Sequence, residues 1–169
     1  MSAVQQVDVV IVGAGMVGVT LATALAPSGL NIWILEQRDG DPAAYPAVVH
    51  QQQAAGYDPR VSALTCASQQ ILTSVGAWER MLTYRVCPYT HMDVWDGEGT
   101  GHIHFSANEL HEPCLGHIVE NRVTLAALYE VMGTHDNLHF QSGVAVTELA
   151  ESNGGTRLLT LSDGRQIAA

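Results

Sequence analysis

Apolar residues along the first part of the chain follow a strand pattern, then a helix pattern, then a strand pattern again. Residues 7–12 form a nearly continuous run of β-branched side chains, which is typical of a parallel strand buried on both faces. A second apolar run at residues 31–35 predicts another strand, and the segment between them predicts a helix that begins near Met16 and is stopped at Pro27. The pattern therefore predicts a strand–helix–strand unit that ends at Glu36.

The next segment, residues 37–59, is rich in Pro, Ala, Gln and Gly and has neither a helical nor a strand period. We expect a long surface loop there. Helical spacing returns over residues 65–74, and a short second helix is predicted over residues 77–82. A dinucleotide-binding dehydrogenase would continue its first unit with a helix and a third buried parallel strand, so the lack of such a strand in this segment counts against that class.

Beyond residue 90 the pattern becomes that of short strands. Two of them, at residues 92–95 and 102–105, flank a glycine-dense turn. A third, at residues 115–119, leads into a helix over residues 121–132, for which Asn121 is the expected N-cap. More strands are predicted near the end of the chain, with hairpin turns at 153–155 and 163–164: residues 138–141, 144–149, 156–161 and a last one from residue 166.

This order of elements predicts an α/β fold in which a Rossmann-like βαβ unit with a parallel sheet is followed by a β-meander. Residues 89–115 form a β-hairpin excursion in this scheme, and they are the candidate for a second domain. At 169 residues the chain is long enough to bury a hydrophobic core of its own.

Three glycines that follow the first predicted strand, Gly13, Gly15 and Gly18, have the G-x-G-x-x-G spacing of a nucleotide-binding turn. The first permits a tight turn, the second lets a pyrophosphate approach the backbone, and the third lets the helix lie close to the strand. The N–H groups of Met16 and Val17 then point toward the phosphates with the positive end of the helix dipole. We predict a bound nucleotide; the alternative is a glycine-rich turn without a ligand.

Glu36 stands at the end of the second predicted strand, where a carboxylate accepts hydrogen bonds from an adenosine ribose. Such charge-assisted bonds contribute about 1.5–3 kcal/mol each. The same carboxylate repels a 2′-phosphate, so NADP is disfavoured at this position. A carboxylate at this position is compatible with both NAD and FAD.

The chain is acidic, with a net charge of −10, seven arginines and no lysine. This balance argues against nucleic acid or an anionic membrane as a partner. The opening residues lack the basic region of a signal peptide, and we expect no transmembrane segment. For an anionic cofactor, each of the few arginines therefore matters.

Histidine and cysteine positions do not predict a metal site. His102 and His104 alternate onto one face of a predicted strand, but H-x-H without a third ligand at fixed spacing is a weak signal, and solvated histidines are the favoured interpretation. The three cysteines, Cys66, Cys87 and Cys114, lack metal-type pairs. We interpret them as packing thiols in a reducing compartment.

Five short motifs together resemble one family. They are residues 8–18, 35–38, 60–64, 94–96 and 116–121. They are similar to the ubiquinone-biosynthesis hydroxylases, flavin monooxygenases of the p-hydroxybenzoate hydroxylase type, and most of all to the bacterial 2-polyprenylphenol hydroxylases within that family. The resemblance covers nearly the whole chain. It implies a Rossmann-like FAD-binding domain whose hairpin excursion belongs to a partial, β-rich substrate domain.

The resemblance also implies a FAD site, residue by residue. It assigns the ribose and pyrophosphate contacts and the strand that passes the adenine to Gly13, Gly15, Met16, Val17, Gly18, Glu36, Gln37, Val144 and Ala145.

The flavin end of the cofactor is assigned in the same way. Arg60 matches the arginine that reaches the flavin pyrophosphate, and a guanidinium can hold phosphate oxygens bidentately. Val61 and Ser62 match positions beside the isoalloxazine ring. Glu120 departs from the family pattern, which often has a glutamine there. Arg122 is placed either near the phosphates or in a surface ion pair.

The implied reaction is hydroxylation of a polyprenylated phenol. NAD(P)H reduces FAD, O₂ forms a flavin hydroperoxide, and the ring attacks its distal oxygen, so no side chain of this chain is required as a catalytic residue. The resemblance also implies a cytoplasmic protein, with peripheral association with the inner membrane and a ubiquinone-biosynthesis complex as further expectations.

Two later flavin motifs of the family, a G-A-D-G-like and a G-D-A-like stretch, are missing before Ala169. We therefore expect the N-terminal part of a longer enzyme, which by itself binds FAD weakly or not at all and does not hydroxylate. Unpaired strand edges near the C-terminus predict self-association. A NAD-dependent dehydrogenase and a non-catalytic FAD- or ADP-binding module are the alternatives.

Overall fold

A computed structural model describes residues 4–151 and 155–169, and it contains the predicted strand–helix–strand unit. Strand β2 (Val9–Val12) leads into helix α1 (Met16–Leu25), and after the short 3₁₀ helix η1 (Ala26–Ser28) the chain returns as β3 (Ile32–Leu35). The two strands pair in parallel, with Ile11 opposite Ile34. The unit is thus confirmed.

The third strand of this parallel sheet comes from far along the sequence. Strand β9 (Leu138–Gln141) pairs in parallel with β3, with Phe140 opposite Ile34, so the sheet order is β2-β3-β9. Helix α5 (Asn121–Met132) precedes β9 and packs against α1. The segment directly after β3 supplies no strand, as expected.

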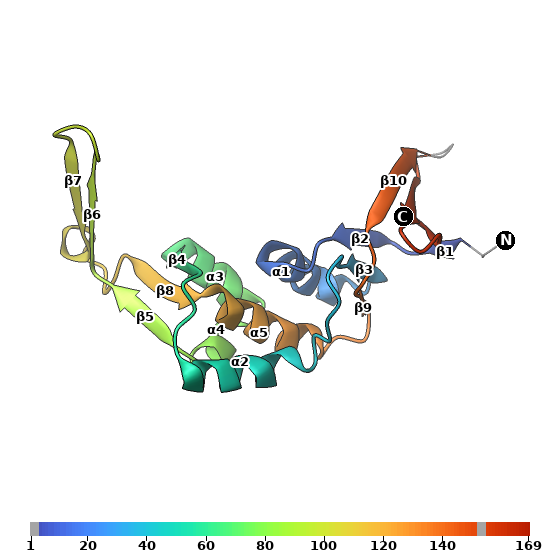
Figure 1. Cartoon of the computed structure of the whole chain (residues 1–169), viewed down its shortest axis with the longest axis horizontal. Coiled ribbons are helices and arrows are strands. Elements are labelled where there is room, and N and C mark those ends of the chain that lie inside the picture. The colour runs from blue at the N-terminus through green and yellow to red at the C-terminus, as the bar shows by residue number, and fades with distance from the viewer. Residues whose placement is uncertain (1–3, 152–154) are drawn as a thin grey trace.

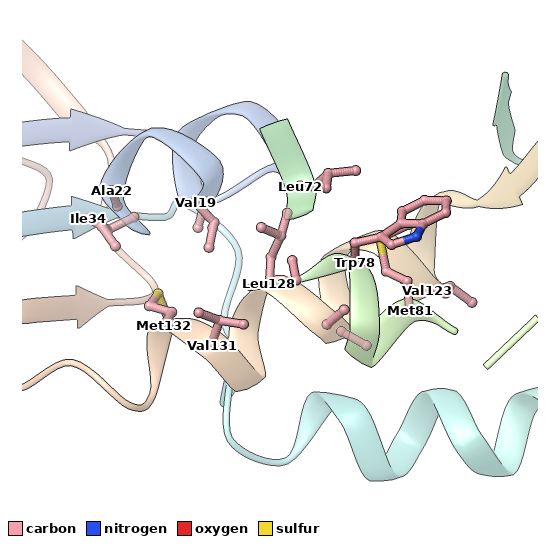
Figure 2. Packing of buried hydrophobic residues seen from close by; sticks show 14 of the residues in the cluster. Val19, Ala22, Ile34, Leu72, Trp78, Met81, Val123, Leu128, Val131 and Met132 are labelled. Atoms are coloured by element: carbon pink, nitrogen blue, oxygen red, sulfur yellow. The ribbon is translucent and has the colours of Figure 1, made fainter. Parts of the chain in front are cut away.

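The main hydrophobic core lies between α1, α5 and the parallel sheet and continues along α5 (Figure 2). Val19 and Leu128 are fully buried in it, because α1 and α5 each turn an apolar face toward the other. Farther along α5, helices α3 (Cys66–Ser74) and α4 (Trp78–Met81) close the core with Leu72 and Met81.

A second, antiparallel sheet lies at the N-terminal end of α5 (Figure 1). Its order is β4-β8-β5, built from β4 (Val61–Thr65), β8 (Gly116–Glu120) and β5 (Val86–Tyr89). Because β8 runs directly into α5, this sheet and the core share one continuous element.

The predicted hairpin excursion projects from that sheet at one end of the molecule (Figure 1). It consists of β6 (His91–Trp95) and β7 (His102–Ser106), followed by the 3₁₀ helix η2 (Ala107–Leu110). Every residue of the two strands except Ser106 is exposed. The hairpin as such is confirmed, and its membership of a substrate domain stays a prediction.

The meander forms a third sheet at the opposite end of the molecule, beside both chain ends (Figure 1). The sheet order is β1-β12-β11-β10, in which β1 (Gln5–Gln6) pairs in parallel with β12 (Gln166–Ala168). The other two strands are β10 (Val146–Glu151) and β11 (Arg157–Leu161). The turn predicted at residues 153–155 lies largely outside the described residues, and the turn at Gly164 is present, with a φ of 83°.

Two local predictions were wrong. Residues 45–55 are not loop but helix α2 (Tyr45–Ala55), which has a proline in its first turn and buries a single apolar side chain, Val49, completely. With one buried residue, the segment shows no helical period in its sequence. The helix is stabilised by its packing against α5. Asn121 is the first residue of α5 rather than its N-cap; Glu120 holds the cap position, and the Asn121 side chain accepts from Ser62 instead.

Candidate functional site

The turn between β2 and α1 has the backbone shape that a nucleotide-binding loop requires. Gly13 has a φ of 104°, in the left-handed region that favours glycine, and its N–H donates to the Leu35 carbonyl at 2.7 Å. A Cβ at Gly18 would overlap the carbonyl oxygen of Gly13. These two glycines are therefore required by the turn itself, with or without a ligand.

Gly15 differs from its two neighbours in the motif. Its φ of −73° is open to any residue, and a Cβ built on it meets no atom within 4 Å. It is also the N-cap of α1, and no side chain caps this helix in the described part of the chain. The first N–H groups of α1 therefore lack a side-chain cap at the positive end of the helix dipole, which is the arrangement that binds phosphate.

The Glu36 carboxylate is fixed at the edge of this turn. Its Oε2 accepts from the N–H of Ala14 at 2.9 Å, and its Oε1 accepts from the N–H of Arg38 at 2.9 Å. The hydrogen bond from Arg38 holds the Glu36 pKa below its usual value, and the one from Ala14 adds to this effect against partial burial. Each oxygen keeps a second lone pair, so the ionised carboxylate is free to accept from a ribose.

A cavity of about 230 Å³ opens beside Glu36. Tyr129 on α5 lies in its wall and donates its hydroxyl to the Ala14 carbonyl at 3.0 Å. Its ring makes edge contacts with Tyr45 at 5.3 Å and Phe140 at 5.9 Å between centroids. The lining residues, mainly glycine-turn, loop and aromatic residues, are Ala14, Gly15, Glu36, Arg38, Asp39, Gly40, Asp41, Pro42, Tyr45, Leu125, Tyr129 and Phe140.

Burial of the two tyrosines in this wall affects their acidity. It raises the Tyr129 pKa to about 12, and the nearby Glu36 charge acts in the same direction. Burial also raises the Tyr45 pKa, while the positive charge of Arg60 opposes this shift. Both phenols are therefore neutral at physiological pH.

Residues 143–145 run beside the Glu36 segment, and they precede β10, which begins at Val146. The Val144 N–H donates to the Glu36 carbonyl at 3.1 Å, and Val144 is buried. Ala145 exchanges hydrogen bonds with Ser162, donating to its Oγ and accepting from its N–H. A cofactor contact of Ala145 would thus be made by its side chain, and it stays a prediction.

The predicted flavin-side residues lie at the start of β4. The Arg60 side chain is 76% exposed, with Nε 3.8 Å from Asp58 Oδ1. Val61 is half exposed, and the Ser62 hydroxyl donates to Asn121 Oδ1 at 2.6 Å. Arg60 is therefore held loosely enough to reach a phosphate, whereas Ser62 has a partner within the protein.

Arg122 is not on the surface. Its side chain is only 11% exposed, and its Nε donates to Oε2 of the buried Glu120 at 2.7 Å. The surface ion pair weighed from the sequence is thus a buried one. Contact of Arg122 with the phosphates stays a prediction.

The fold brings Gly13, Gly15, Gly18 and Glu36 into one cradle, with Met16 and Val17 in the first turn of α1 and Gln37 exposed beside Glu36. The aromatic wall was not predicted. Tyr45 was hidden by the loop prediction for its segment, and Tyr129 lies on a predicted helix without any signal of which face it occupies. The fit of this cradle to the adenosine and pyrophosphate of a dinucleotide rests on the open space at Gly15 and on the fixed carboxylate.

Among the described residues, no group of three or more His, Cys, Asp or Glu is placed so that it could hold a metal ion. On the hairpin, Asp93 Oδ1 accepts from His104 Nδ1 at 2.8 Å and lies 3.2 Å from His102 Nε2. The two histidines predicted to share a face thus do so, as partners of a carboxylate.

Residues 6–131 match the family model described as FAD binding domain. The chain belongs to this FAD-binding domain family. Its cofactor is FAD, and its α/β fold is that of the family. Within the described residues, no helix has the length and hydropathy needed to cross a bilayer.

Curated relatives of this FAD-binding domain include several ubiquinone hydroxylases. The 3-demethoxyubiquinol 3-hydroxylase of Escherichia coli is 37% identical over 131 residues, 78% of this chain and 31% of that protein. Ubiquinone hydroxylase UbiL of Rhodospirillum rubrum is 33% identical over 99% of this chain and 36% of that protein. Human COQ6 is 34% identical over 72% of this chain and 25% of that protein. The chain spans about a third of the length of such relatives.

Solved structures share the fold at lower identity. PqsL of Pseudomonas aeruginosa has a TM-score of 0.70 at 14% identity, over 96% of this chain and 41% of that one. The flavin-dependent monooxygenase PieE, solved in complex with FAD and substrate, has a TM-score of 0.70 at 16% identity, over 97% of this chain and 29% of that one. At such identities the likeness shows the fold.

Proposed function

We propose that this chain is the N-terminal, FAD-binding part of an FAD-dependent hydroxylase that acts on a polyprenylated phenol in ubiquinone biosynthesis, with NAD(P)H as electron donor and O₂ as oxidant. The observation that carries the nucleotide-binding part of the proposal is the Glu36 carboxylate fixed at an open glycine turn, and the match to an FAD binding domain supports FAD as that nucleotide. The names of the relatives support the substrate class. The dehydrogenase alternative is not favoured, because the family match is to a FAD-binding domain.

In this proposal the protein's own residues bind and orient the cofactor. The backbone at Gly15 and the first turn of α1 bind the pyrophosphate, and Glu36 accepts from the adenosine ribose. Arg60 neutralises phosphate on the flavin side, and Val61 and Ser62 lie along the ring. FAD supplies the electron-transfer and oxygen-transfer chemistry when bound, so the protein contributes position and exclusion of water. Further contacts are proposed for Met16, Val17, Gly13, Gly18, Gln37, Arg122 and Ala145.

Location and assembly follow from the same proposal. We place the protein in the cytoplasm, peripheral to the inner membrane, because a polyprenylated phenol partitions into lipid. Self-association or membership of a ubiquinone-biosynthesis complex fits the strand edges of β1 and β10, which are the outer strands of their sheet.

Ligand titration tests the cofactor part of the proposal. The chain is titrated with FAD, AMP, 2′-phospho-AMP and NAD, and binding is followed by NMR chemical shifts. This method measures dissociation constants up to the millimolar range. We expect FAD and AMP to shift the amide signals of Ala14 and Gly15, and 2′-phospho-AMP to bind more weakly because Glu36 repels its extra phosphate. Strong binding of NAD without FAD would favour the dehydrogenase alternative instead.

The reaction is tested on the complete product of the gene. Turnover of a polyprenylphenol that depends on NAD(P)H and O₂ is the expected result. FAD binding without oxidation of any such phenol would leave the non-catalytic binding module as the better account.

A further inference from the structure

A carboxylate is buried where β8 meets α5. The Glu120 side chain is 5% exposed, and its Oε2 accepts from the Asp58 N–H at 3.0 Å and from Arg122 Nε at 2.7 Å. Its Oε1 lies 3.0 Å from Arg85 Nη2. One acid thus binds two guanidinium groups and one backbone N–H from a different segment of the chain.

The same two arginines also hold the segment before Arg60. The Gly56 carbonyl accepts from Arg85 Nη2 at 2.6 Å and from Arg122 Nη2 at 3.0 Å. The Arg85 guanidinium lies 4.1 Å from the centre of the Tyr57 ring. Residues 56–58 are therefore attached to the β8–α5 junction through side chains that Glu120 keeps in place.

The backbone of Arg60 is fixed by the next links of this network. Its N–H donates to Asp58 Oδ1 at 2.8 Å, and its carbonyl accepts from the Asn121 N–H at 2.9 Å. Its side chain, by contrast, is 76% exposed. The network thus fixes the backbone position of Arg60 and leaves its guanidinium available to contact a ligand.

Stability alone gives no reason for such an arrangement. Burying the charges of Glu120 and Arg122 is costly, and apolar residues of similar volume commonly stabilise a fold as well as or better than a buried ion pair does. What the charged network supplies is a fixed relative position of two segments, because each hydrogen bond has a preferred direction.

We propose that Glu120 is a positioning residue for the cofactor: it holds segment 56–60 so that Arg60 meets the flavin-side phosphate. The inference rests on the proposed function, since it needs a bound FAD. Arg85 and Arg122 serve this role by orienting Glu120, and Asp58 passes the position on to Arg60.

A double-mutant cycle between Glu120 and Arg60 tests the proposal. FAD and AMP affinities are measured by NMR titration for Glu120→Gln, Arg60→Ala and the double variant. AMP lacks the flavin-side phosphate, so it reports on the adenosine end alone. We expect Glu120→Gln to weaken FAD binding about tenfold when Arg60 is present and less than about twofold when it is replaced, with AMP affinity unchanged throughout.

A matched control is available on helix α5, which directly follows Glu120. Glu130 also pairs with an arginine and a second donor, Arg80 at 3.0 Å and Tyr84 at 2.6 Å, and neither partner belongs to segment 56–60. Glu130→Gln should therefore leave both affinities unchanged. If Glu120→Gln does not fold, as judged by circular dichroism, Asp58→Ala takes its place in the cycle, because it removes the acceptor of the Arg60 N–H.

Two outcomes overturn the inference and can be told apart. Equal losses of FAD affinity with and without Arg60, or no loss at all, contradict the positioning role while AMP binding keeps the proposed function standing. If the unchanged chain binds neither FAD nor AMP, the proposed function fails and this inference fails with it.

Discussion

The Glu36 carboxylate accepts a hydrogen bond from the backbone N–H of Ala14 at 2.9 Å, across 22 residues of sequence. This bond ties the end of β3 to the turn that follows β2. It therefore sets the distance between the two groups that a dinucleotide needs at once, a ribose acceptor and a pyrophosphate turn. Each side of this cradle can be tested separately.

Gly15→Ala should weaken nucleotide binding and leave the stability of the fold nearly unchanged. The new Cβ meets no protein atom and the backbone is already in an ordinary conformation, so the free energy of unfolding should stay within about 0.5 kcal/mol. The same methyl group occupies the space of the pyrophosphate, and we expect FAD affinity to fall about tenfold or more. Urea denaturation and NMR titration give the two numbers.

Gly18→Ala is the counterpart of that experiment. Its Cβ would overlap the carbonyl oxygen of Gly13, which is backbone and cannot rotate away. We expect a clear loss of stability, about 1–3 kcal/mol, before any ligand is added. A Gly18→Ala chain as stable as the unchanged one contradicts the close approach of α1 to β2.

Glu36 should make the fold sensitive to acid. Its folded pKa is lowered by the N–H groups of Arg38 and Ala14, so it contributes stability above its ordinary pKa of about 4.5, and this is lost as the pH falls through the lower folded value. Urea unfolding between pH 7 and pH 3 should therefore show a smaller acid loss for Glu36→Gln. Identical pH profiles for the two proteins would contradict the lowered pKa.

Tyr129 should make the stability of the fold sensitive to alkaline pH. Its folded pKa is raised from 10.0 to about 12, so its contribution is complete below pH 10 and is lost as the pH rises toward 12. Tyr129→Phe removes the bond to the Ala14 carbonyl, and we expect a loss of about 1 kcal/mol at pH 7. Between pH 10 and pH 12, the free energy of unfolding should also fall less for Tyr129→Phe than for the unchanged chain. Tyr84 is present in both proteins, so its contribution is the same in both.

Helix α2 can be tested with two adjacent valines. Val49 is fully buried whereas Val48 is 44% exposed. Val49→Ala should lower the free energy of unfolding by about 2 kcal/mol, and Val48→Ala by less than about 0.5 kcal/mol. Urea denaturation measures both. Equal effects of the two changes would mean that α2 does not pack on α5 as described.

Helix α2 is an element that the sequence pattern failed to predict. Residues 45–55 contain one buried apolar position, Val49, and a proline that starts the helix, so neither periodicity nor composition distinguishes them from a loop. Their helical state depends on contacts with α5, such as the Tyr45–Tyr129 ring pair. Tyr45 and Tyr129 are more than 80 residues apart in the sequence, so no local pattern encodes their contact.

The glycine turn, the strands on either side of α1 and the acid at Glu36 were determined by the sequence alone, because each depends on local rules: the φ angle that glycine permits, the burial of β-branched runs and the helical period. Only the tertiary structure decided that Tyr129 lines the cradle and that Glu120 binds Arg85 and Arg122. The reason is physical. A buried charge or hydroxyl is placed by partners from other elements. These partners become neighbours only when α5 packs against α1 and α2 and when β5, which follows Arg85, pairs with β8.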